Sequence, residues 1–412
     1  MQFGNSARSL ELQERVQDFM VSRVYPAERL YHEQILASGD PHHQPAVMED
    51  LKSEAREQGL WNLFHPSVEW GGGLTNVEYA PLAEIMGRSL IAPEVFNCSA
   101  PDTGNMEVLT LFGSAEQQDK WLKPLLSGEI RSAFCMTEPD VASSDPTNIE
   151  FRIERDGGDY VLNGVKWWAT NLYHPNCRVL LVFGRSGVDG PRHQRHSVVL
   201  VPVDTPGVTV RRALPVMGFQ HQEGHAEVAF DDVRVPAANL VGVEGRGFEM
   251  GQARLGPGRI HHCMRAVGMA ERALELLCSR ARSRSTFGRS IADNANVQDW
   301  IAESRIGIEM TRLLVMKAAW LMDTVGNSKA RTEIAAIKVA APHVALRVID
   351  RAIQVHGAAG LGDDVPLASM WAFQRALRIA DGPDEVHKRS IALRELRDSE
   401  TLVAGAAEVA AS

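Results

Sequence analysis

The sequence lacks the features that mark several classes of protein. No stretch approaches the ~20 consecutive apolar residues that a membrane-spanning helix needs, and the first residues have neither the basic start nor the apolar run of a secretory signal. We therefore expect no membrane span and a cytoplasmic protein. Basic residues are also fewer than acidic ones, 43 Lys and Arg against 52 Asp and Glu, which gives a formal net charge of −9. A nucleic-acid partner is not expected, because it would require a basic surface.

Cysteine is scarce as well. The five cysteines are odd in number and form no C-x-x-C pair, which predicts reduced thiols, no structural disulfide and no zinc knuckle. His221 and His225 stand four residues apart, but Gly218, Gly224 and the strand pattern that follows argue against the helix that a zinc site with this spacing needs. We expect no metal site, and we expect the adjacent pair His261-His262 to be structural or at the surface.

The sequence does contain ample material for a folded core, since 44% of its 412 residues are hydrophobic and 23% are charged. Apolar residues recur at helical spacing up to about residue 130, and Ser114 with Gln117 forms a capping-box pattern that predicts a helix starting near residue 115. Short β-branched runs separated by Asn-Gly, Asp-Gly and Pro-Gly follow, and then long amphipathic helices. This order predicts an α+β multi-domain protein: an N-terminal all-α domain (1–130), a middle antiparallel β domain (131–240) and a C-terminal helical bundle (241–412).

Two segments at the start of the β region carry side chains that suit a flat polar ring. Residues 134–139 read FCMTEP, and residues 163–171 read NGVKWWATN. Hydroxyl groups of Thr137, Ser144 and Thr170 can meet the edge of such a ring, and Trp168 can stack on its face. Taken alone, these residues indicate ordinary turns and hairpins more strongly than a binding site.

The sequence resembles the acyl-CoA dehydrogenase family at five motifs, which occur in the family's order and span nearly the whole chain. Besides the flavin segment just described, they are EVAFDDVRVP (227–236), RSTFG (284–288), QVHGAAG (354–360) and IADG (379–382). WW (167–168), WIAES (300–304) and ADGPDEVH (380–387) are most similar to the branch of family members ten and eleven. The resemblance implies the acyl-CoA dehydrogenase fold, in which the middle β domain is barrel-like and the C-terminal domain is a four-helix bundle.

The resemblance also implies an FAD cofactor and assigns its contacts by position. Arg284, Phe287 and the segment at 354–358 would reach the FAD of a neighbouring subunit, so a homodimer or homotetramer is expected, and a guanidinium is well suited to a pyrophosphate. Three features of the cofactor segments depart from the family pattern: Ala295 stands where Gln is common, Pro383 stands where Thr is usual, and the flavin loop at 140–144 is one residue longer than usual. The residues expected at the cofactor are Phe134, Met136, Thr137, Ser144, Trp168, Thr170, Arg284, Phe287, Gln354, Gly357, Ala358, Pro383 and Glu385.

The family's reaction removes the α proton of an acyl-CoA thioester while the β hydride moves to flavin N5. Asp381 stands where most relatives have the catalytic Glu, and the earlier-helix position that some relatives use is Gly258 here. An Asp carboxylate lies about 1.5 Å further back than that of Glu, so the resemblance implies either a reshaped site or a different chemistry. Asp384 and Glu385 are rival bases nearby in the sequence. Ser144, Arg259 and Gly382 are expected to bind the substrate.

The implied activity is dehydrogenation of an acyl-CoA to the trans-2-enoyl-CoA, as in fatty acid β-oxidation, with an electron-transfer flavoprotein as the electron acceptor. Two alternatives stay open. The same fold could act as an acyl-CoA oxidase or flavin monooxygenase, in which oxygen accepts the electrons. The chain could also be a helical interaction protein without catalysis.

Overall fold

The computed structural model describes residues 4–186, 190–220 and 223–411. The chain separates into two compact units. The first, here called the sheet unit, consists of Arg8–Thr75 and Ser89–Gly258. The second, here called the helical unit, consists of Asn76–Arg88 and the chain from Arg259 onward, with the N-terminal residues up to Ala7. The division into three domains at residues 130 and 240 stays a prediction.

The first part of the sheet unit is helical, as its apolar spacing predicts. The capping box is confirmed: Gln117 N donates to Ser114 Oγ, and Ser114 N donates to Gln117 Oε1, each at 3.2 Å, so the helix begins at Ala115. Two π-helical segments, Met20–Val24 and Gln118–Leu122, join α1 to α2 and α7 to α8. The helices are α1 (Ala7–Phe19), α2 (Tyr25–Ser38), α3 (Ala46–Glu57), α5 (Ala92–Val95), α6 (Asp102–Phe112), α7 (Ala115–Gln117) and α8 (Lys123–Ser127).

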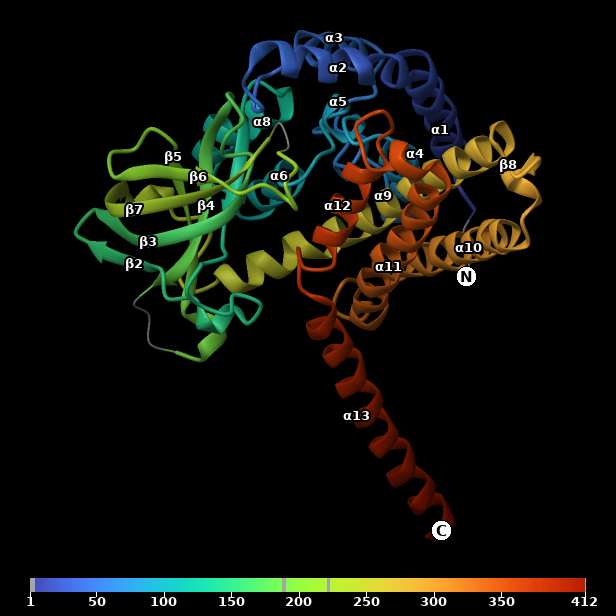
Figure 1. The fold of residues 1–412 in the computed structure, drawn as a ribbon. Helices are drawn as coiled ribbons and strands as arrows, with labels where there is room; N and C mark the ends of the chain where they lie inside the picture. Colours follow the sequence, from blue (N-terminus) through green and yellow to red (C-terminus); the bar gives the residue numbers. More distant parts are fainter. Residues whose placement is uncertain (1–3, 187–189, 221–222, 412) are drawn as a thin grey trace. The chain divides into compact units, whose positions relative to one another are not determined.

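A seven-stranded sheet forms the rest of this unit (Figure 1). Its order is β1-β4-β2-β3-β7-β6, and β5 pairs with the other edge of β4. The strand patterns seen in the sequence between residues 160 and 230 fall in β3 to β7. The strands are β1 (Arg131–Cys135), β2 (Arg152–Asp156), β3 (Asp159–Thr170), β4 (Cys177–Ser186), β5 (His196–Pro202), β6 (Val208–Ala213) and β7 (His225–Pro236).

The sheet is mixed rather than wholly antiparallel. The predicted antiparallel pairing is confirmed for β2/β3, β3/β7, β4/β5 and β6/β7, but β1 and β2 both lie parallel to β4, one after the other along one edge. Tight turns predict antiparallel neighbours, and neither β1 nor β2 is joined to β4 by a turn, because β3 intervenes in the chain. The core of the sheet includes the buried run 179–184 of β4, and Phe151 and Phe230 pack edge-to-face with ring centroids 5.1 Å apart.

The helical unit confirms the predicted C-terminal bundle and adds one helix from the N-terminal third of the chain. In it, α10 packs against α11 and α4, and α11 packs against α12 and α13 (Figure 1). Gly87 of α4 and Gly268 of α9 permit a close approach of these two helices. A Cβ at Gly87 would collide with the backbone of α9, and a Cβ at Gly268 would collide with the backbone of α4. The helices are α4 (Asn76–Gly87), α9 (Gly247–Ser283, here from Arg259), α10 (Ala295–Val325), α11 (Arg331–His356), α12 (Leu367–Leu377) and α13 (Asp384–Ala411).

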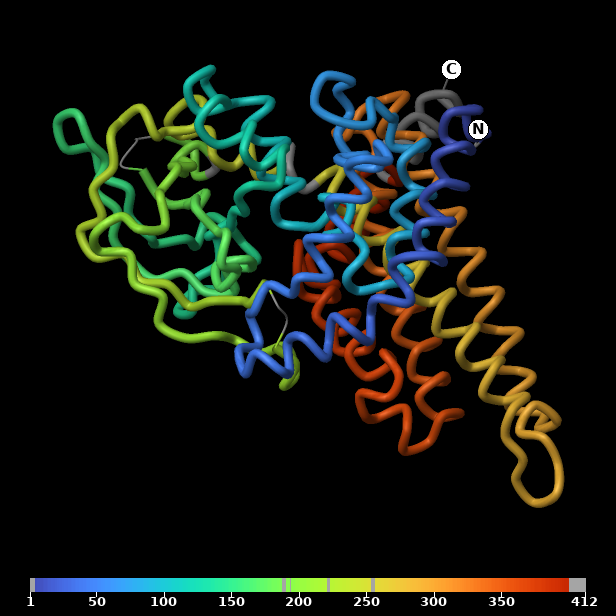
Figure 2. Tube along the Cα trace, turned by 90° about the horizontal axis from the view of Figure 1, so that it is seen from above, coloured from blue at the N-terminus to red at the C-terminus, as the bar shows by residue number. Residues whose placement is uncertain are grey.

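A short hairpin connects α9 to α10. Its strands, β8 (Ser285–Thr286) and β9 (Arg289–Ser290), are joined by Phe287 and Gly288, whose positive φ values of 51° and 79° suit a two-residue hairpin turn. The hairpin lies at the tip of the α9–α10 pair (Figures 1 and 2).

All five cysteines are free thiols, four of them buried. Within the described part of the chain, no helix has both the length and the apolar character to cross a bilayer.

Candidate active site

The end of β1 and the middle of β3 are joined by reciprocal hydrogen bonds. Trp167 N donates to the carbonyl of Thr137 at 3.0 Å, and Thr137 Oγ1 donates to the carbonyl of Trp167 at 2.7 Å. Lys166 Nζ donates to the carbonyl of Met136 at 2.7 Å. Phe134, Met136 and Thr137 are each half-buried. The two segments that the sequence singles out, 134–139 and 163–171, therefore lie side by side.

A bulge in β3 turns Trp168 outward. The register of β3 against β7 shifts between Lys166 and Ala169, and Trp168 has a φ of 53° and is 41% exposed. Bulges of this kind re-aim a side chain and often lie beside active sites. Further along the strand, Thr170 Oγ1 lies 2.9 Å from Nδ1 of His225, whose ring centroid is 5.6 Å from that of Trp168. An open indole face thus lies near hydroxyl groups, an arrangement that fits a flat ring with polar edges.

The loop after β1 is anchored from beneath by Glu138. Its carboxylate accepts hydrogen bonds from Lys166 Nζ at 2.7 Å and from the backbone N–H groups of residues 150–151 at 3.0 Å, while Glu138 N donates to Ser143 Oγ at 2.9 Å. Burial lowers the pKa of Lys166 to about 8, although Glu138 acts in the opposite direction. These contacts hold the loop in place and leave Ser144 exposed at its surface.

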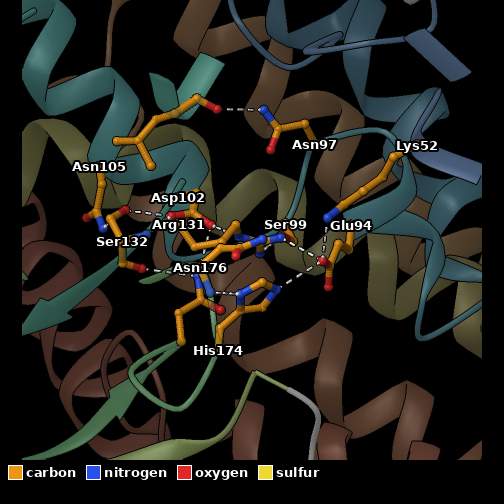
Figure 3. A network of polar contacts seen from close by, with 12 residues as sticks. Lys52, Glu94, Asn97, Ser99, Asp102, Asn105, Arg131, Ser132, His174 and Asn176 are labelled. Carbon is orange, nitrogen blue, oxygen red and sulfur yellow. Dashed lines mark hydrogen bonds and ion pairs between the residues drawn. The ribbon is translucent and has the colours of Figure 1, made fainter. Parts of the chain in front are cut away.

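A buried polar network lies under the C-terminal end of β3 (Figure 3). Asp102 of α6 accepts hydrogen bonds from Arg131 Nε at 2.5 Å, Ser132 N at 2.7 Å and Asn171 Nδ2 at 2.8 Å. Asn171 Nδ2 also donates to the carbonyl of Ser132 at 3.1 Å. Because Asn171 directly follows Thr170 and has a φ of 75°, the network holds the strand end that carries the predicted flavin contacts.

The same network continues to Glu94 (Figure 3). Glu94 Oε1 lies 2.9 Å from Arg131 Nη1, 3.0 Å from Lys52 Nζ and 3.5 Å from His174 Nε2. Burial alone would raise the pKa of Glu94, but Arg131 and Lys52 outweigh it and hold the pKa well below its ordinary value. The carboxylate therefore stays ionised, with each of these charges paired inside the protein.

In the helical unit, Asp381 lies in a strained turn before α13. Its φ is 55°, and its carbonyl accepts hydrogen bonds from Arg259 Nε at 3.3 Å and Nη2 at 3.2 Å. Nε2 of His387 lies 3.3 Å from the same carbonyl. Gly382 has a φ of 103°, and a Cβ there would lie 2.9 Å from His387 Nε2. A positive φ is costly for residues other than Gly, so these donors stabilise the conformation that presents Asp381.

Cationic and imidazole groups surround this turn. His262 Nε2 lies 3.5 Å from Asp381 Oδ2. Burial, with Arg259 and Lys338 nearby, lowers the pKa of His387 to about 4, so this imidazole is neutral near pH 7 and donates its Nε2–H to Asp381. Lys338 is fully buried and donates to the carbonyl of Leu377, and burial lowers its pKa.

The rival base Asp384 is already engaged in structural contacts. It begins α13, its side chain is buried, and its Oδ2 lies 2.7 Å from His343 Nε2 and 2.8 Å from Arg378 Nε. Burial opposes ionisation, but bonds to His343 and Arg378 lower the pKa of Asp384. A carboxylate held in this way is a poor proton acceptor. Glu385, the other rival, is exposed on the first turn of α13.

The remaining predicted positions of the helical unit lie on its surface. Phe287 lies in the turn of the β8–β9 hairpin and is fully exposed, and Arg284 directly precedes the hairpin. Gln354 is exposed in the last turn of α11, and Ala358 is exposed in the 3-10 turn that follows it, where Gly357 adopts a φ of 64°. Arg259, Asp381, Gly382 and Pro383, by contrast, gather around the turn before α13.

Sequence reasoning missed His262, His387 and Lys338 as neighbours of Asp381. The sequence predicts that His261 and His262 are both structural or at the surface. Instead, His262 contacts Asp381. His261 packs against Tyr79, with ring centroids 4.7 Å apart. A signal was present, because Arg259 and His262 are three residues apart on one helix and so share a face.

The metal hypothesis concerned His221, which lies outside the described residues, and His225, which is the neighbour of Thr170. Among the described residues, no group of three or more His, Cys, Asp or Glu side chains could hold a metal ion.

Comparison with protein families gives three matches in succession along the chain. Residues 6–129 match the acyl-CoA dehydrogenase N-terminal domain, residues 133–233 the middle domain, and residues 245–396 the C-terminal domain of the same family.

Individual proteins are similar over nearly the whole chain. A probable acyl-CoA dehydrogenase, FadE2, of Mycobacterium tuberculosis is 55% identical, over 98% of this chain and 99% of its own. Acyl-CoA dehydrogenase family member 11 of Rattus norvegicus is 53% identical over 96% of this chain, which spans 51% of the rat protein. The solved structure of a putative acyl-CoA dehydrogenase from Mycobacterium abscessus is 52% identical, has a TM-score of 0.93, and is matched over 96% of this chain and 100% of its own.

Proposed function

Because the chain belongs to the acyl-CoA dehydrogenase family and is an oxidoreductase, we propose that it dehydrogenates an acyl-CoA thioester to the trans-2-enoyl-CoA. Asp381 is the base that removes the α proton, and an electron-transfer flavoprotein takes up the electrons. The observation that carries this proposal is the turn at Asp381, whose carbonyl is held by Arg259 and His387. The motif resemblance assigns the family's base to this position.

FAD is the cofactor, and the chemistry of the predicted contacts fits it. The open face of Trp168 suits the flavin ring, and the hydroxyls of Thr137 and Thr170 suit its polar edge. Arg284 carries an exposed guanidinium of the kind that binds diphosphates in a bidentate manner. When bound, FAD supplies the acceptor for the substrate's β hydride.

Asp381 performs the proton transfer. The α C–H of a thioester is a weak acid, so the base must be held close to it with little freedom. Arg259 and His387 bind the Asp381 carbonyl, so they orient the residue through its backbone. This backbone support offers one way in which a shorter Asp can replace Glu: the turn, rather than the side chain, sets the reach of the carboxylate.

Anaerobic visible spectra test the proposed function directly. Purified protein, incubated with FAD, is mixed with butyryl-, octanoyl- or palmitoyl-CoA. We expect at least one of them to bleach the oxidised-flavin band, and we expect electron-transfer flavoprotein to restore the band faster than oxygen does. Rapid recovery with oxygen alone would instead identify an oxidase. A protein that binds no FAD, or whose flavin no acyl-CoA bleaches, would contradict the proposal.

We further propose a homodimer or homotetramer in the cytoplasm, where free thiols persist. One face of α10 exposes Ile306 (58%), Met310 (68%) and Leu313 (58%), three apolar side chains at i, i+4 and i+7. Such a stripe is costly to leave in water and suits burial against another copy. The fully exposed Phe287 supports the same conclusion.

Met310→Glu is expected to shift the protein to a smaller oligomer, because it places a charge in the apolar stripe on α10. Light scattering coupled to size-exclusion chromatography measures the mass. Leu36→Glu is the matched control, since Leu36 is 81% exposed on α2, outside this stripe, and should leave the mass unchanged. A monomeric wild-type protein, or an unchanged mass for Met310→Glu, would refute the interface.

A further inference from the structure

One face of α9 directs three polar side chains toward the turn that contains Asp381 or toward each other. Arg259, His262 and Arg265 follow one another at intervals of three residues, so they lie along one side of the helix. Arg259 binds the carbonyl of Asp381, and Nε2 of His262 lies 3.5 Å from its Oδ2. Nη2 of Arg265 lies 3.3 Å from Nδ1 of His262. Arg265, His262 and Asp381 therefore form a chain of contacts that ends at the carboxylate.

The chemistry of the Arg265 guanidinium determines which atom donates in its hydrogen bond with His262. Arginine has only N–H donors and no acceptor, so Nδ1 of His262 must accept a hydrogen bond from Arg265. Protonation of Nδ1 would place one N–H against another beside a positive charge. The imidazole is therefore neutral, and its proton is on Nε2, the ring nitrogen that lies 3.5 Å from Asp381 Oδ2.

The three side chains that form this series of contacts are well shielded from water. Arg265 is 7% exposed, and the side chains of His262 and Asp381 are 16% and 23% exposed. A donor that is already oriented in such a place acts more strongly on a carboxylate than it would in water. Among the described residues, other charged or titratable groups near Asp381 include Arg259 and Cys263 on α9, Lys338 on α11 and His387 on α13.

We propose that His262 is a positioning residue for the base: its Nε2–H, oriented by Arg265, holds Oδ2 of Asp381 so that Oδ1 accepts the α proton. This inference rests on the proposed function, in which Asp381 is the base. In this arrangement, the imidazole restricts the rotation of the shorter Asp side chain. It also stabilises the ionised form of Asp381, because a polarised N–H close to a carboxylate favours its charged state.

The tautomer of His262 is testable without any substrate. The full-length protein is labelled with ¹⁵N at histidine, and the signal of His262 is identified by its loss in His262→Gln. We expect the neutral form with Nε2 protonated between pH 6 and 8. An imidazolium, or a neutral ring protonated at Nδ1, would overturn the inference.

A pair of variants tests the effect on the base. His262→Leu removes the donor at similar volume, whereas His262→Gln places an amide N–H near the position of Nε2. With the acyl-CoA that bleaches the flavin best, we expect His262→Leu to keep its FAD and lose on the order of 10- to 100-fold in kcat. When kcat/KM of His262→Leu is plotted against pH, the acidic limb should lie at a pH higher by roughly one unit than in the wild-type protein. The reason is that ionised Asp381 loses its stabilising contact with His262. His262→Gln should restore most of the rate and the position of the limb.

The outcomes separate this inference from the function on which it rests. If Asp381→Asn abolishes turnover while His262→Leu has a wild-type rate and pH profile, His262 has no positioning role and the proposed base stands. If Asp381→Asn turns over as fast as wild type, the proposed base itself is wrong. An equal loss in the Leu and Gln variants would also overturn the inference, since it would indicate a role in packing alone.

Discussion

Asp381→Asn is expected to bind FAD like the wild-type protein and to lose about 100- to 10,000-fold in turnover, the usual contribution of a general base. Asn has nearly the same shape as Asp, and the contacts of Arg259 and His387 to the carbonyl of residue 381 do not involve the side chain, so the turn should persist. The amide has no basic oxygen at neutral pH and cannot take the α proton. Turnover per bound flavin, with the flavin counted by its absorbance, measures the effect.

Two matched variants identify the base among the nearby acids. Asp364→Asn changes an exposed carboxylate in the loop before α12 and should leave turnover unchanged. Asp384→Asn should lower stability, because it weakens the contacts with His343 and Arg378, while keeping at least part of the turnover. If Asp384→Asn, rather than Asp381→Asn, abolished turnover with FAD still bound, the assignment of the base would be wrong.

Asp102→Ala is expected to lower the free energy of unfolding by about 3–5 kcal/mol, the range found when one partner of a buried ion pair is removed. The side chain of Asp102 is 2% exposed. It accepts hydrogen bonds from Arg131 and Ser132 (Figure 3) and from Asn171. Its loss leaves these donors buried and underpaired. Urea unfolding followed by circular dichroism measures the change.

A surface ion pair provides the control for this prediction. Oδ1 of Asp119 lies 2.5 Å from Nζ of Lys123, and these side chains are 66% and 56% exposed. Asp119→Ala should therefore change the free energy of unfolding by less than about 1 kcal/mol. Asp102→Ala should also weaken FAD binding, because Asn171 loses a contact directly beside Thr170. Equal effects for the two alanine variants would show that the buried network contributes little to stability.

Local pattern was sufficient to predict many of the elements. The capping box at Ser114 specified the start of a helix through hydrogen bonds within four residues, and the β-branched runs specified β3 to β7. The parallel pairing of β1 and β2 with β4 could not be read in this way, because the paired strands are not neighbours in the chain. The membership of α4 in the helical unit depended on Gly87 and Gly268, whose facing positions are far apart in the sequence.

What the sequence determined by itself was the chemistry available: a carboxylate at position 381, hydroxyls at 137 and 170, an indole at 168, and five motifs in a family's order. The tertiary structure decided which groups act on one another. The bulge that turns Trp168 outward, the positive φ of Asp381, and the contact of His262 with its carboxylate all depend on packing between segments distant in the chain. A contact of this kind requires its two atoms to lie within about 4 Å of each other. Only the folded backbone brings Nε2 of His262 to 3.5 Å from Oδ2 of Asp381.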